Sequence, residues 1–137
     1  MLGLAVTIAR IAHAGQKYGE QDFYEAHLKK VAGIVERKQL PSEVVAVALL
    51  HDVLEDTAFT AEQLLALGVS PLVVREVQVL TRGKQEQYFD YIARIKAHGG
   101  IALQVKLADL EANSDPATVK AKLKPRYEKA LQILGAA

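Results

Sequence analysis

The stretch LLHDVLEDT, residues 49–57, ends a strongly hydrophobic run with one imidazole and three carboxylates. With 3.6 residues per helical turn, His51 and Asp52 continue the apolar face that begins with Val44 and Ala48. Burying an unpaired carboxylate on such a face costs several kcal/mol, whereas a bound cation would make the same position favourable. The spacing therefore indicates a metal-binding helix end.

Two other segments place polar residues on faces that are otherwise apolar. His27 lies one turn before Val31, and Asp109 lies one turn after Val105, with Asn113 a further turn along. Taken singly, an inward-facing histidine is more often a hydrogen-bonded core residue than a ligand. Taken with the His-Asp pair of residues 51–52, the pattern offers two imidazoles and two carboxylates from three helices to one ion.

Glu55 and Asp56 follow the His-Asp pair by one turn. If the helix continues, they stack on His51 and Asp52 at the i, i+4 spacing, where carboxylates repel each other and the helix dipole adds to the cost. Two interpretations stay open. The pair forms either a solvated helix end with Asp56 as a cap, or the groups that face a metal-activated water.

Composition limits the other possibilities. The 137 residues are one domain's worth of chain, half of them hydrophobic, with a net charge of +1. We expect no nucleic-acid partner, because the sequence has no basic stripe beyond a solvated helix face at 120–124. Without cysteine, any metal must be held by His, Asp, Glu or backbone oxygen.

With no signal sequence and no apolar run of membrane-spanning length, we expect a cytoplasmic protein without a membrane partner; the oligomeric state is open.

Residues that begin or end helices recur along the chain, and patterns typical of strands are nearly absent. Capping boxes or a cap followed by proline mark four helix starts, at Asp22, Thr60, Ser70 and Asp115. The expected helices span 2–14, 22–38, 41–54, 60–67, 71–81, 86–97, 100–112 and 116–134, and Pro125 should kink or split the last one. The fold class is therefore all-α, a compact single domain over residues 1–137 with about seven or eight short helices.

The ordered motifs resemble the HD superfamily of metal-dependent phosphohydrolases, in particular the hydrolase domain of RelA/SpoT proteins and their small stand-alone relatives. The matching motifs are AHAGQ at 12–16, Tyr24 and His27, ALLHDVLEDT at 48–57, and VKLAD with Asn113 at 105–113. The resemblance implies that a divalent metal, manganese by family preference, is bound by His27, His51, Asp52 and Asp109. It further implies that Glu55 and Asp56 position or deprotonate the attacking water, and that Asn113 lines the nucleotide pocket.

Candidate substrate contacts are less specific. Lys17 and Lys106 could hold the remaining phosphate charge, and Tyr88 and Arg94 could line a base and phosphate site; each could equally serve surface or packing roles. His13 is interpreted as a packing residue or as support for the site. The chain also departs from the family pattern, with Leu28 where proline is usual, Tyr18 where a basic residue is usual, and ADLEAN at 108–113.

The resemblance implies a hydrolase that releases pyrophosphate from a nucleotide, with the guanosine tetraphosphate alarmone as leading substrate. One alternative is an HD-type nucleotidase that acts on nucleoside monophosphates and releases orthophosphate. A second is a catalytically inactive nucleotide-binding regulator, which would not need the acidic pair of residues 55–56.

Overall fold

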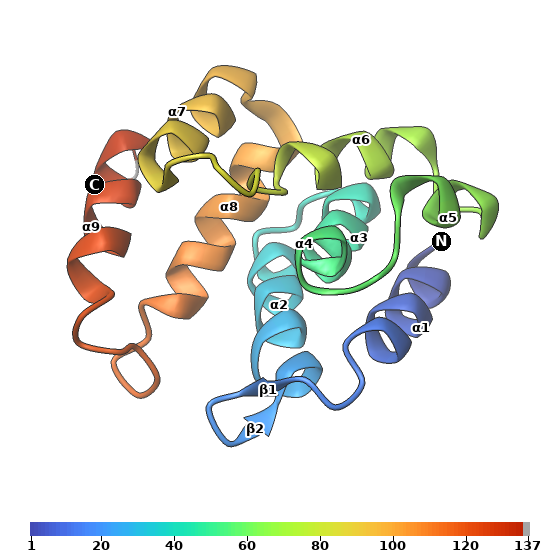
Figure 1. Ribbon diagram of the computed structural model, residues 1–137, viewed down its shortest axis with the longest axis horizontal. Helices are drawn as coiled ribbons and strands as arrows, with labels where there is room; N and C mark the ends of the chain where they lie inside the picture. The colour runs from blue at the N-terminus through green and yellow to red at the C-terminus, as the bar shows by residue number, and fades with distance from the viewer. Residues whose placement is uncertain (136–137) are drawn as a thin grey trace.

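The computed structural model describes residues 1–135, and it consists almost entirely of short helices (Figure 1). The α-helices are α1 (Leu2–Ala12), α2 (Lys29–Arg37), α3 (Ser42–Leu50), α4 (Val53–Asp56), α5 (Ala61–Ala66), α6 (Pro71–Val79), α7 (Tyr88–His98), α8 (Gly100–Asn113) and α9 (Lys124–Ile133). A π-helical turn, η1 (Tyr24–Leu28), runs directly into α2. The all-α class expected from the sequence is confirmed. None of the helices in residues 1–135 is long and apolar enough to cross a membrane.

Helix α3 lies at the centre of the fold. Every residue from Val44 to Leu50 is buried, and the helix contacts α1, α2, α6 and α8. A short helix that is apolar on all sides is stable only when neighbours cover all of its faces. Its C-terminal end therefore delivers His51 and Asp52 to the interior of the molecule, beside η1 and α8.

The helix expected over 41–54 is interrupted at its most polar point. Helix α3 ends at Leu50, and Asp52 adopts φ −102° and ψ 0°, outside the helical region, before the single turn of α4 begins at Val53. The turn from Asp52 to Asp56 is still closed by a hydrogen bond from the Asp56 amide to the Asp52 carbonyl oxygen at 3.0 Å. The break lets the side chains of residues 51–52 and 55–56 turn to different partners.

A small hairpin precedes η1, and the sequence did not predict it. Strand β1 (Lys17–Tyr18) pairs antiparallel with β2 (Gln21–Asp22), and Gly19 in the connecting turn has φ +63°. Strands of two residues are too short to show an alternating pattern. The Asp22 carboxylate accepts a hydrogen bond from the Glu25 amide at 3.1 Å, as the capping pattern predicted, so the helix begins after the hairpin.

The last predicted helix begins later than expected. Residues 116–123 form turns, in which the Asp115 carboxylate accepts a hydrogen bond from the Ala117 amide at 2.9 Å. Pro125 then stands in the first turn of α9 instead of kinking a longer helix. Proline is well tolerated there because the first amides of a helix have no intrahelical acceptor. The Asp-Pro pair at 115–116 thus starts a turn, a role that this residue pair also favours.

Two other helix starts agree with the sequence. Thr60 and Gln63 form the complete capping box of α5, and the Ser70 hydroxyl accepts a hydrogen bond from the Val73 amide at the start of α6. The β-branched segment from Pro71 onward is helical, as its length and cap predicted.

Helix α8 is held in register by a carboxylate from α6. The buried Glu76 accepts a hydrogen bond from the Ala102 amide at 3.0 Å, and its other oxygen lies 2.7 Å from His98 Nε2. The Ala102 amide belongs to the first turn of α8 and has no intrahelical acceptor, so Glu76 caps that helix from outside.

We expect Glu76→Ala to lower the free energy of unfolding by about 2 kcal/mol, because hydrogen bonds to a charged group contribute more than neutral ones. Urea denaturation would measure the change. Glu36→Ala, which removes an exposed carboxylate, is the matched control and should change stability by less than about 0.5 kcal/mol. A loss as small as the control's would show that Glu76 does not anchor α8.

Candidate metal centre

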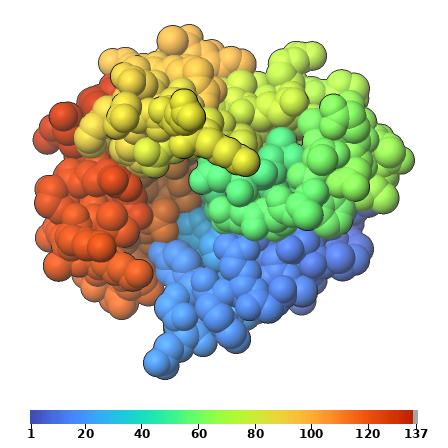
Figure 2. Space-filling model, viewed as in Figure 1, coloured from blue at the N-terminus to red at the C-terminus, as the bar shows by residue number. Residues whose placement is uncertain are grey.

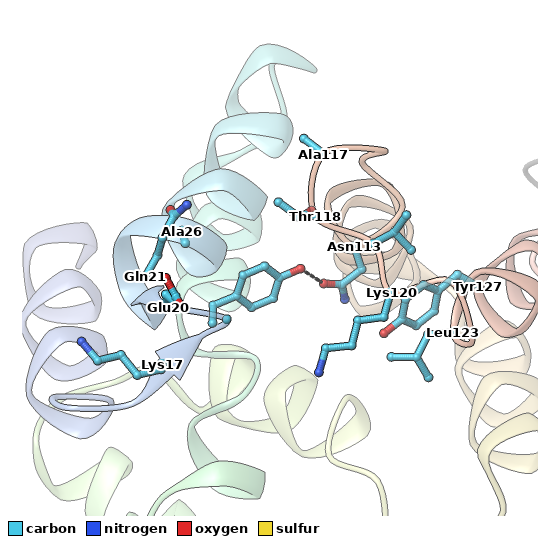
Figure 3. A pocket seen from close by; sticks show the side chains of 13 residues that line it. Lys17, Glu20, Gln21, Ala26, Asn113, Ala117, Thr118, Lys120, Leu123 and Tyr127 are labelled. Carbon is cyan, nitrogen blue, oxygen red and sulfur yellow. Dashed lines mark hydrogen bonds between the residues drawn. The ribbon is translucent and has the colours of Figure 1, made fainter.

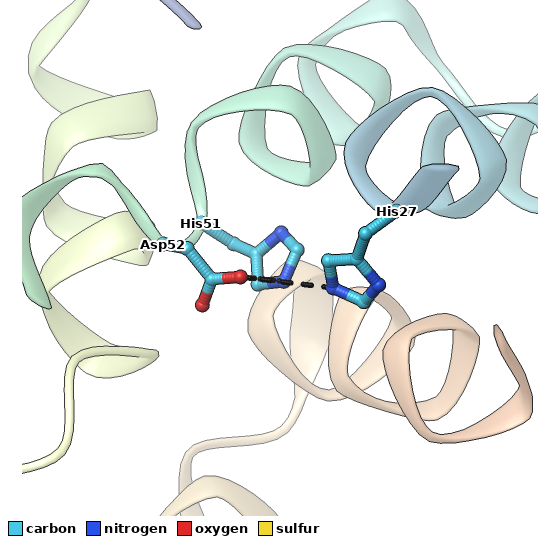
Figure 4. A group of neighbouring side chains, drawn as sticks. All are labelled: His27, His51 and Asp52. Atoms are coloured by element: carbon cyan, nitrogen blue, oxygen red, sulfur yellow. Dashed lines mark ion pairs between the residues drawn. The ribbon is translucent and has the colours of Figure 1, made fainter. Parts of the chain in front are cut away.

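Four side chains that are distant in sequence meet in one buried cluster. His27 comes from η1, His51 and Asp52 from the turn between α3 and α4, and one ligand atom of each lies within 4.8 Å of the other two (Figure 4). Asp52 Oδ2 is 3.2 Å from His51 Nε2 and 3.6 Å from His27 Nε2. Asp109 of α8 adds an Oδ1 atom 3.0 Å from His27 Nε2 and 3.3 Å from His51 Nε2. The structure therefore brings together the complete set that the sequence nominated as metal ligands.

The donor set suits a divalent cation. His51 Nδ1 lies 2.6 Å from the Ala48 carbonyl oxygen, which can only accept, so Nδ1 carries a hydrogen and Nε2 faces the carboxylates. Burial alone would lower the pKa of His51, but the carboxylates of Asp52 and Asp109 raise it to about 9. Two imidazole nitrogens and two carboxylate oxygens thus create a point that strongly favours positive charge, and the mixed set fits a divalent metal ion.

Asp109 is oriented by its neighbours on α8. Lys106 Nζ donates to Asp109 Oδ2 at 2.9 Å, and Asn113 Nδ2 donates to Oδ1 at 3.3 Å. Although burial favours the neutral acid, the Lys106 ammonium and the two imidazoles hold the pKa of Asp109 well below its usual range. Lys106 is itself buried, and the Asp109 carboxylate raises its pKa well above the ordinary value. Lys106 therefore fixes the carboxylate so that Oδ1 faces the imidazoles.

Glu55 and Asp56 lie beside this cluster, and each is held by a different hydrogen bond. Glu55 Oε1 accepts a hydrogen bond from the Arg82 backbone amide at 2.9 Å, and Asp56 Oδ2 accepts one from Gln16 Nε2 at 3.2 Å. Burial, followed by the negative charge of Asp52, raises the pKa of Asp56. Burial also raises the pKa of Glu55, with the carboxylates of Asp52 and Asp56 adding to the effect. Carboxylates with raised pKa values take up a proton more readily than ordinary ones, as a general base must.

The AHAGQ motif holds Asp56 in place through a hydrogen bond. The buried His13 places its Nδ1 2.7 Å from Gln16 Oε1, and the other end of the Gln16 amide holds Asp56. The prediction of a packing or supporting role for His13 agrees with its burial and with this contact, whereas no role was predicted for Gln16. No local pattern signalled this role, because Gln16 lies 40 positions from the carboxylate it contacts.

Tyr18 connects His27 to the end of α8. Its ring stacks on the His27 imidazole with centroids 5.1 Å apart and an interplanar angle of 12°, and its hydroxyl donates to Asn113 Oδ1 at 2.7 Å. The same Asn113 amide donates to Asp109. Tyr18 therefore occupies the place of the usual basic residue and supports two members of the cluster without adding charge.

A pocket of about 570 Å³ lies between the β1–β2 hairpin and the segment that leads from α8 into α9, and it is lined by Tyr18 and Asn113, which contact the cluster. The hydrogen bond between Tyr18 and Asn113 joins two residues of its lining, and Figure 3 marks it with a dashed line at Asn113. Lys120 extends into this space toward the hairpin, whereas Lys17 lines the pocket from β1 but points away from Asn113. In Figure 2 the same face is hollowed between the hairpin, the segment after α4, the start of α7, and α9. Lys120 and Tyr127 of this pocket were not nominated from the sequence, because a lysine in a solvated run and a tyrosine at helical spacing carry no distinctive signal.

Arg94 is placed differently from the other nominated substrate contacts. Its guanidinium donates to the Glu86 carboxylate from Nε and one NH2 group, both at 2.9 Å, and to the carbonyl oxygens of Val79 and Thr81. These four bonds hold the loop between α6 and α7. A substrate contact by Arg94 stays a prediction, and four of its five N–H donors are already engaged.

Comparisons with known proteins agree with this geometry. The HD domain family matches residues 5–113. Guanosine-3′,5′-bis(diphosphate) 3′-pyrophosphohydrolase of Haemophilus influenzae is 49% identical over 57 residues, which cover 42% of this chain and 8% of that protein. The bifunctional (p)ppGpp synthase/hydrolase SpoT of Escherichia coli K12 is 42% identical over 72 residues, 50% of this chain and 10% of that protein. The chain thus corresponds to about a tenth of the length of these relatives.

A solved structure described as a metazoan ortholog of SpoT that hydrolyzes ppGpp superimposes with a TM-score of 0.78. The alignment covers 95% of this chain and 83% of the other at 22% sequence identity, so it establishes a shared fold. The family match is the broader evidence, because it spans most of the chain and includes His27, His51, Asp52 and Asp109. The chain therefore belongs to the HD domain family.

Proposed function

We propose that the protein is a metal-dependent phosphohydrolase that releases pyrophosphate from a nucleotide, with ppGpp as its leading substrate. One observation carries the proposal: two imidazoles and two carboxylates converge within a few ångströms beside a pocket of about 570 Å³. Similarity to regions of pyrophosphohydrolases and of SpoT supports the choice of substrate. A nucleotide substrate agrees with the cytoplasmic location expected from the sequence, which stays part of this proposal.

The four clustered side chains would hold one divalent ion. When bound, it would supply Lewis acidity toward a phosphoryl oxygen and a nearby water. Manganese is our first choice, because an imidazole and carboxylate set suits it and the family resemblance favours it. Lys106 then acts through Asp109, keeping one carboxylate oxygen directed at the imidazoles.

Glu55 and Asp56 would accept the proton of the attacking water. As the water oxygen forms its bond to phosphorus, one of these carboxylates accepts the proton that the water loses. The bond between phosphorus and the nucleotide oxygen breaks, and that oxygen takes up a proton to leave a hydroxyl. The Gln16 and Arg82 amide contacts keep the two carboxylates fixed beside the cluster.

The pocket would hold the nucleoside. Tyr18, Asn113 and Tyr127 line it together with the Lys120 ammonium, which gives aromatic surface, an amide and one positive charge. Of the contacts nominated from the sequence, Asn113 and Lys17 lie on this pocket. Tyr88 and Arg94 do not line this pocket and belong to the proposal only as predictions.

The identity of the product tests the proposal. Purified protein supplied with Mn²⁺ should release pyrophosphate from ppGpp, with chelation of the metal abolishing release. Release of orthophosphate from nucleoside monophosphates would favour the nucleotidase alternative. Nucleotide binding without turnover across a broad panel, with metal demonstrably bound, would instead favour the inactive regulator and contradict the proposal.

A further inference from the structure

A second cavity, of about 550 Å³, lies between α2, α8 and α9, and the proposed function does not use it. Its apolar lining comes from Ile34 of α2, Leu107 of α8 and Leu131 of α9. Within residues 1–135, this lining has no member in common with that of the pocket proposed to hold the nucleoside. The α2–α8 cavity, as we call it, is therefore separate from the metal cluster and its pocket.

The charged residues of the α2–α8 cavity leave one cation without a partner. Lys30 Nζ lies 2.6 Å from Asp115 Oδ2, and Lys38 Nζ lies 3.9 Å from Glu111 Oε1. Arg37 also lines the cavity, but it forms no ion pair in the part of the chain that the structure describes. A guanidinium presents paired N–H donors that match a carboxylate or a phosphate group. The cavity therefore offers a cation that can bind an anionic group.

Ser114 adds a hydroxyl whose hydrogen-bonding capacity is unused. The residue lines the same cavity at the end of α8, and its hydroxyl oxygen is buried without a hydrogen-bond partner in residues 1–135. Its backbone amide already bonds to the carbonyl oxygens of Leu110 and Glu111. A buried hydroxyl without a partner costs free energy, and a serine hydroxyl can donate to an anionic oxygen. In the wall of a cavity that also holds an unpaired guanidinium, such a group is a donor available to a ligand.

We infer that the α2–α8 cavity binds a small organic anion, with its carboxylate or phosphate group at Arg37 and its apolar part against the three aliphatic side chains. The Ser114 hydroxyl donates a further hydrogen bond to the ligand. An inorganic anion would leave the aliphatic lining exposed to water, so an organic anion gains more from binding.

Asp115 connects this cavity to the pocket proposed for the nucleoside. Its Oδ2 atom is held by Lys30 of α2, and its Oδ1 atom accepts a hydrogen bond from the Ala117 amide at 2.9 Å. Its carbonyl oxygen accepts from the amides of Thr118 and Val119, each at 2.9 Å. These last three residues line the nucleoside pocket. An anion beside Lys30 competes with Asp115 for the ammonium, so its binding loosens this wall and weakens nucleotide binding. This connection rests on the proposed function, whereas the anion site itself does not.

Binding of model anions tests the site without turnover. In ¹⁵N–¹H NMR spectra of the metal-free protein, benzoate and phenyl phosphate should shift the amides of residues 30–38 and 107–116 more than those of the hairpin at 17–22. The tighter binder of the two identifies the preferred head group. Benzamide, which has the ring without the charge, should bind at least about tenfold more weakly than either anion.

Two variants assign the binding to the named groups. Arg37→Ala should weaken binding of both anions by about tenfold, whereas Arg75→Ala, which removes an exposed arginine of α6, is the matched control and should leave it unchanged. Ser114→Ala should weaken binding without lowering the melting temperature, because the hydroxyl has no partner in residues 1–135. Absence of saturable binding, equal binding of benzamide, shifts centred on the hairpin, or unchanged affinity in both variants would overturn the inference.

A kinetic arm tests the connection to the nucleoside pocket. In the Mn²⁺-loaded protein, saturating benzoate should raise the KM for ppGpp by about fivefold, with kcat changed less than KM. Arg37→Ala should remove this effect without changing the activity measured in the absence of benzoate. An equal rise of KM in that variant, or no rise in the wild-type protein, would overturn the connection. Arg37-dependent binding of benzoate to a protein that hydrolyses no nucleotide would support the anion site and contradict the proposed function.

Discussion

The Asp52→Ala variant is expected to be folded and inactive. Asp52 is the carboxylate that faces both imidazoles, and its oxygen lies 3.2 Å from His51 Nε2 and 3.6 Å from His27 Nε2. Its removal deletes one of the proposed metal ligands and half of the negative charge that favours a cation there. We expect activity to fall by roughly 10³-fold, the upper end of what one lost electrostatic contact costs in other active sites.

The fold should survive this change because the Asp52 side chain makes few other contacts. It is 23% exposed and follows the end of α3 instead of packing in the core. The melting temperature and far-UV circular dichroism should stay close to wild type, while calorimetry should show weaker Mn²⁺ binding. Asp90→Ala, which removes an exposed carboxylate from α7, is the control and should keep full activity. An active Asp52→Ala variant would exclude the proposed metal site.

Lys106→Met is expected to be the most destabilising single substitution near the site. The substitution keeps the length of the side chain but leaves Asp109 without its ammonium partner in the interior. Breaking a buried ion pair from one side costs about 3 kcal/mol or more, because the remaining charge stays in the interior without its main partner. Urea denaturation in the presence of a chelator would measure the loss, with the exposed Lys96→Met as the matched control at less than about 0.5 kcal/mol.

The pH dependence of this loss of stability follows from the direction in which the pKa of Asp109 is shifted. The pKa of Asp109 is lower in the folded protein than in the unfolded chain. The stabilisation that the ionised Asp109 gives the folded protein is therefore complete above an ordinary carboxyl pKa of about 3.9 and is lost as the pH falls toward the lowered value. The stability difference between wild type and Lys106→Met should therefore narrow from about pH 5 to about pH 3. A difference that stays constant over this range would show that Lys106 contributes through packing and not through its charge.

A double-mutant cycle measures the interaction between Lys106 and Asp109 separately from the effect of each substitution alone. Asp109→Asn removes the charge that Lys106 neutralises, so Lys106→Met should cost much less in that background than in wild type. Additive effects of the two substitutions would contradict the paired role that the 2.9 Å contact indicates.

The sequence was sufficient to bring the members of the buried His-Asp cluster together as candidates, because they break a strong apolar pattern. His27, His51 and Asp109 each continue an apolar helical face, and the structure buries all three. The long apolar periodicity of the surrounding helices also made the all-α class predictable. Local signals of this kind depend only on residues within one or two turns.

The missed features depend on contacts between distant segments. The hairpin at 17–22, the contact between Gln16 and Asp56, and the Tyr18 stack on His27 leave no periodic trace. Turn chemistry also competed with helix signals at Asp115, where a good capping residue began a turn. Arg94 looked like a free cation in sequence, but a loop 8 residues upstream supplies its Glu86 partner.

The most direct test of this account is a crystal structure of the Mn²⁺-loaded protein with anomalous diffraction data collected at the manganese absorption edge. We predict one strong anomalous peak, ligated by His27, His51, Asp52 and Asp109, with Glu55 and Asp56 facing its open side. A peak elsewhere, or no peak at this cluster under conditions where the protein hydrolyses nucleotides, would contradict the proposed metal centre.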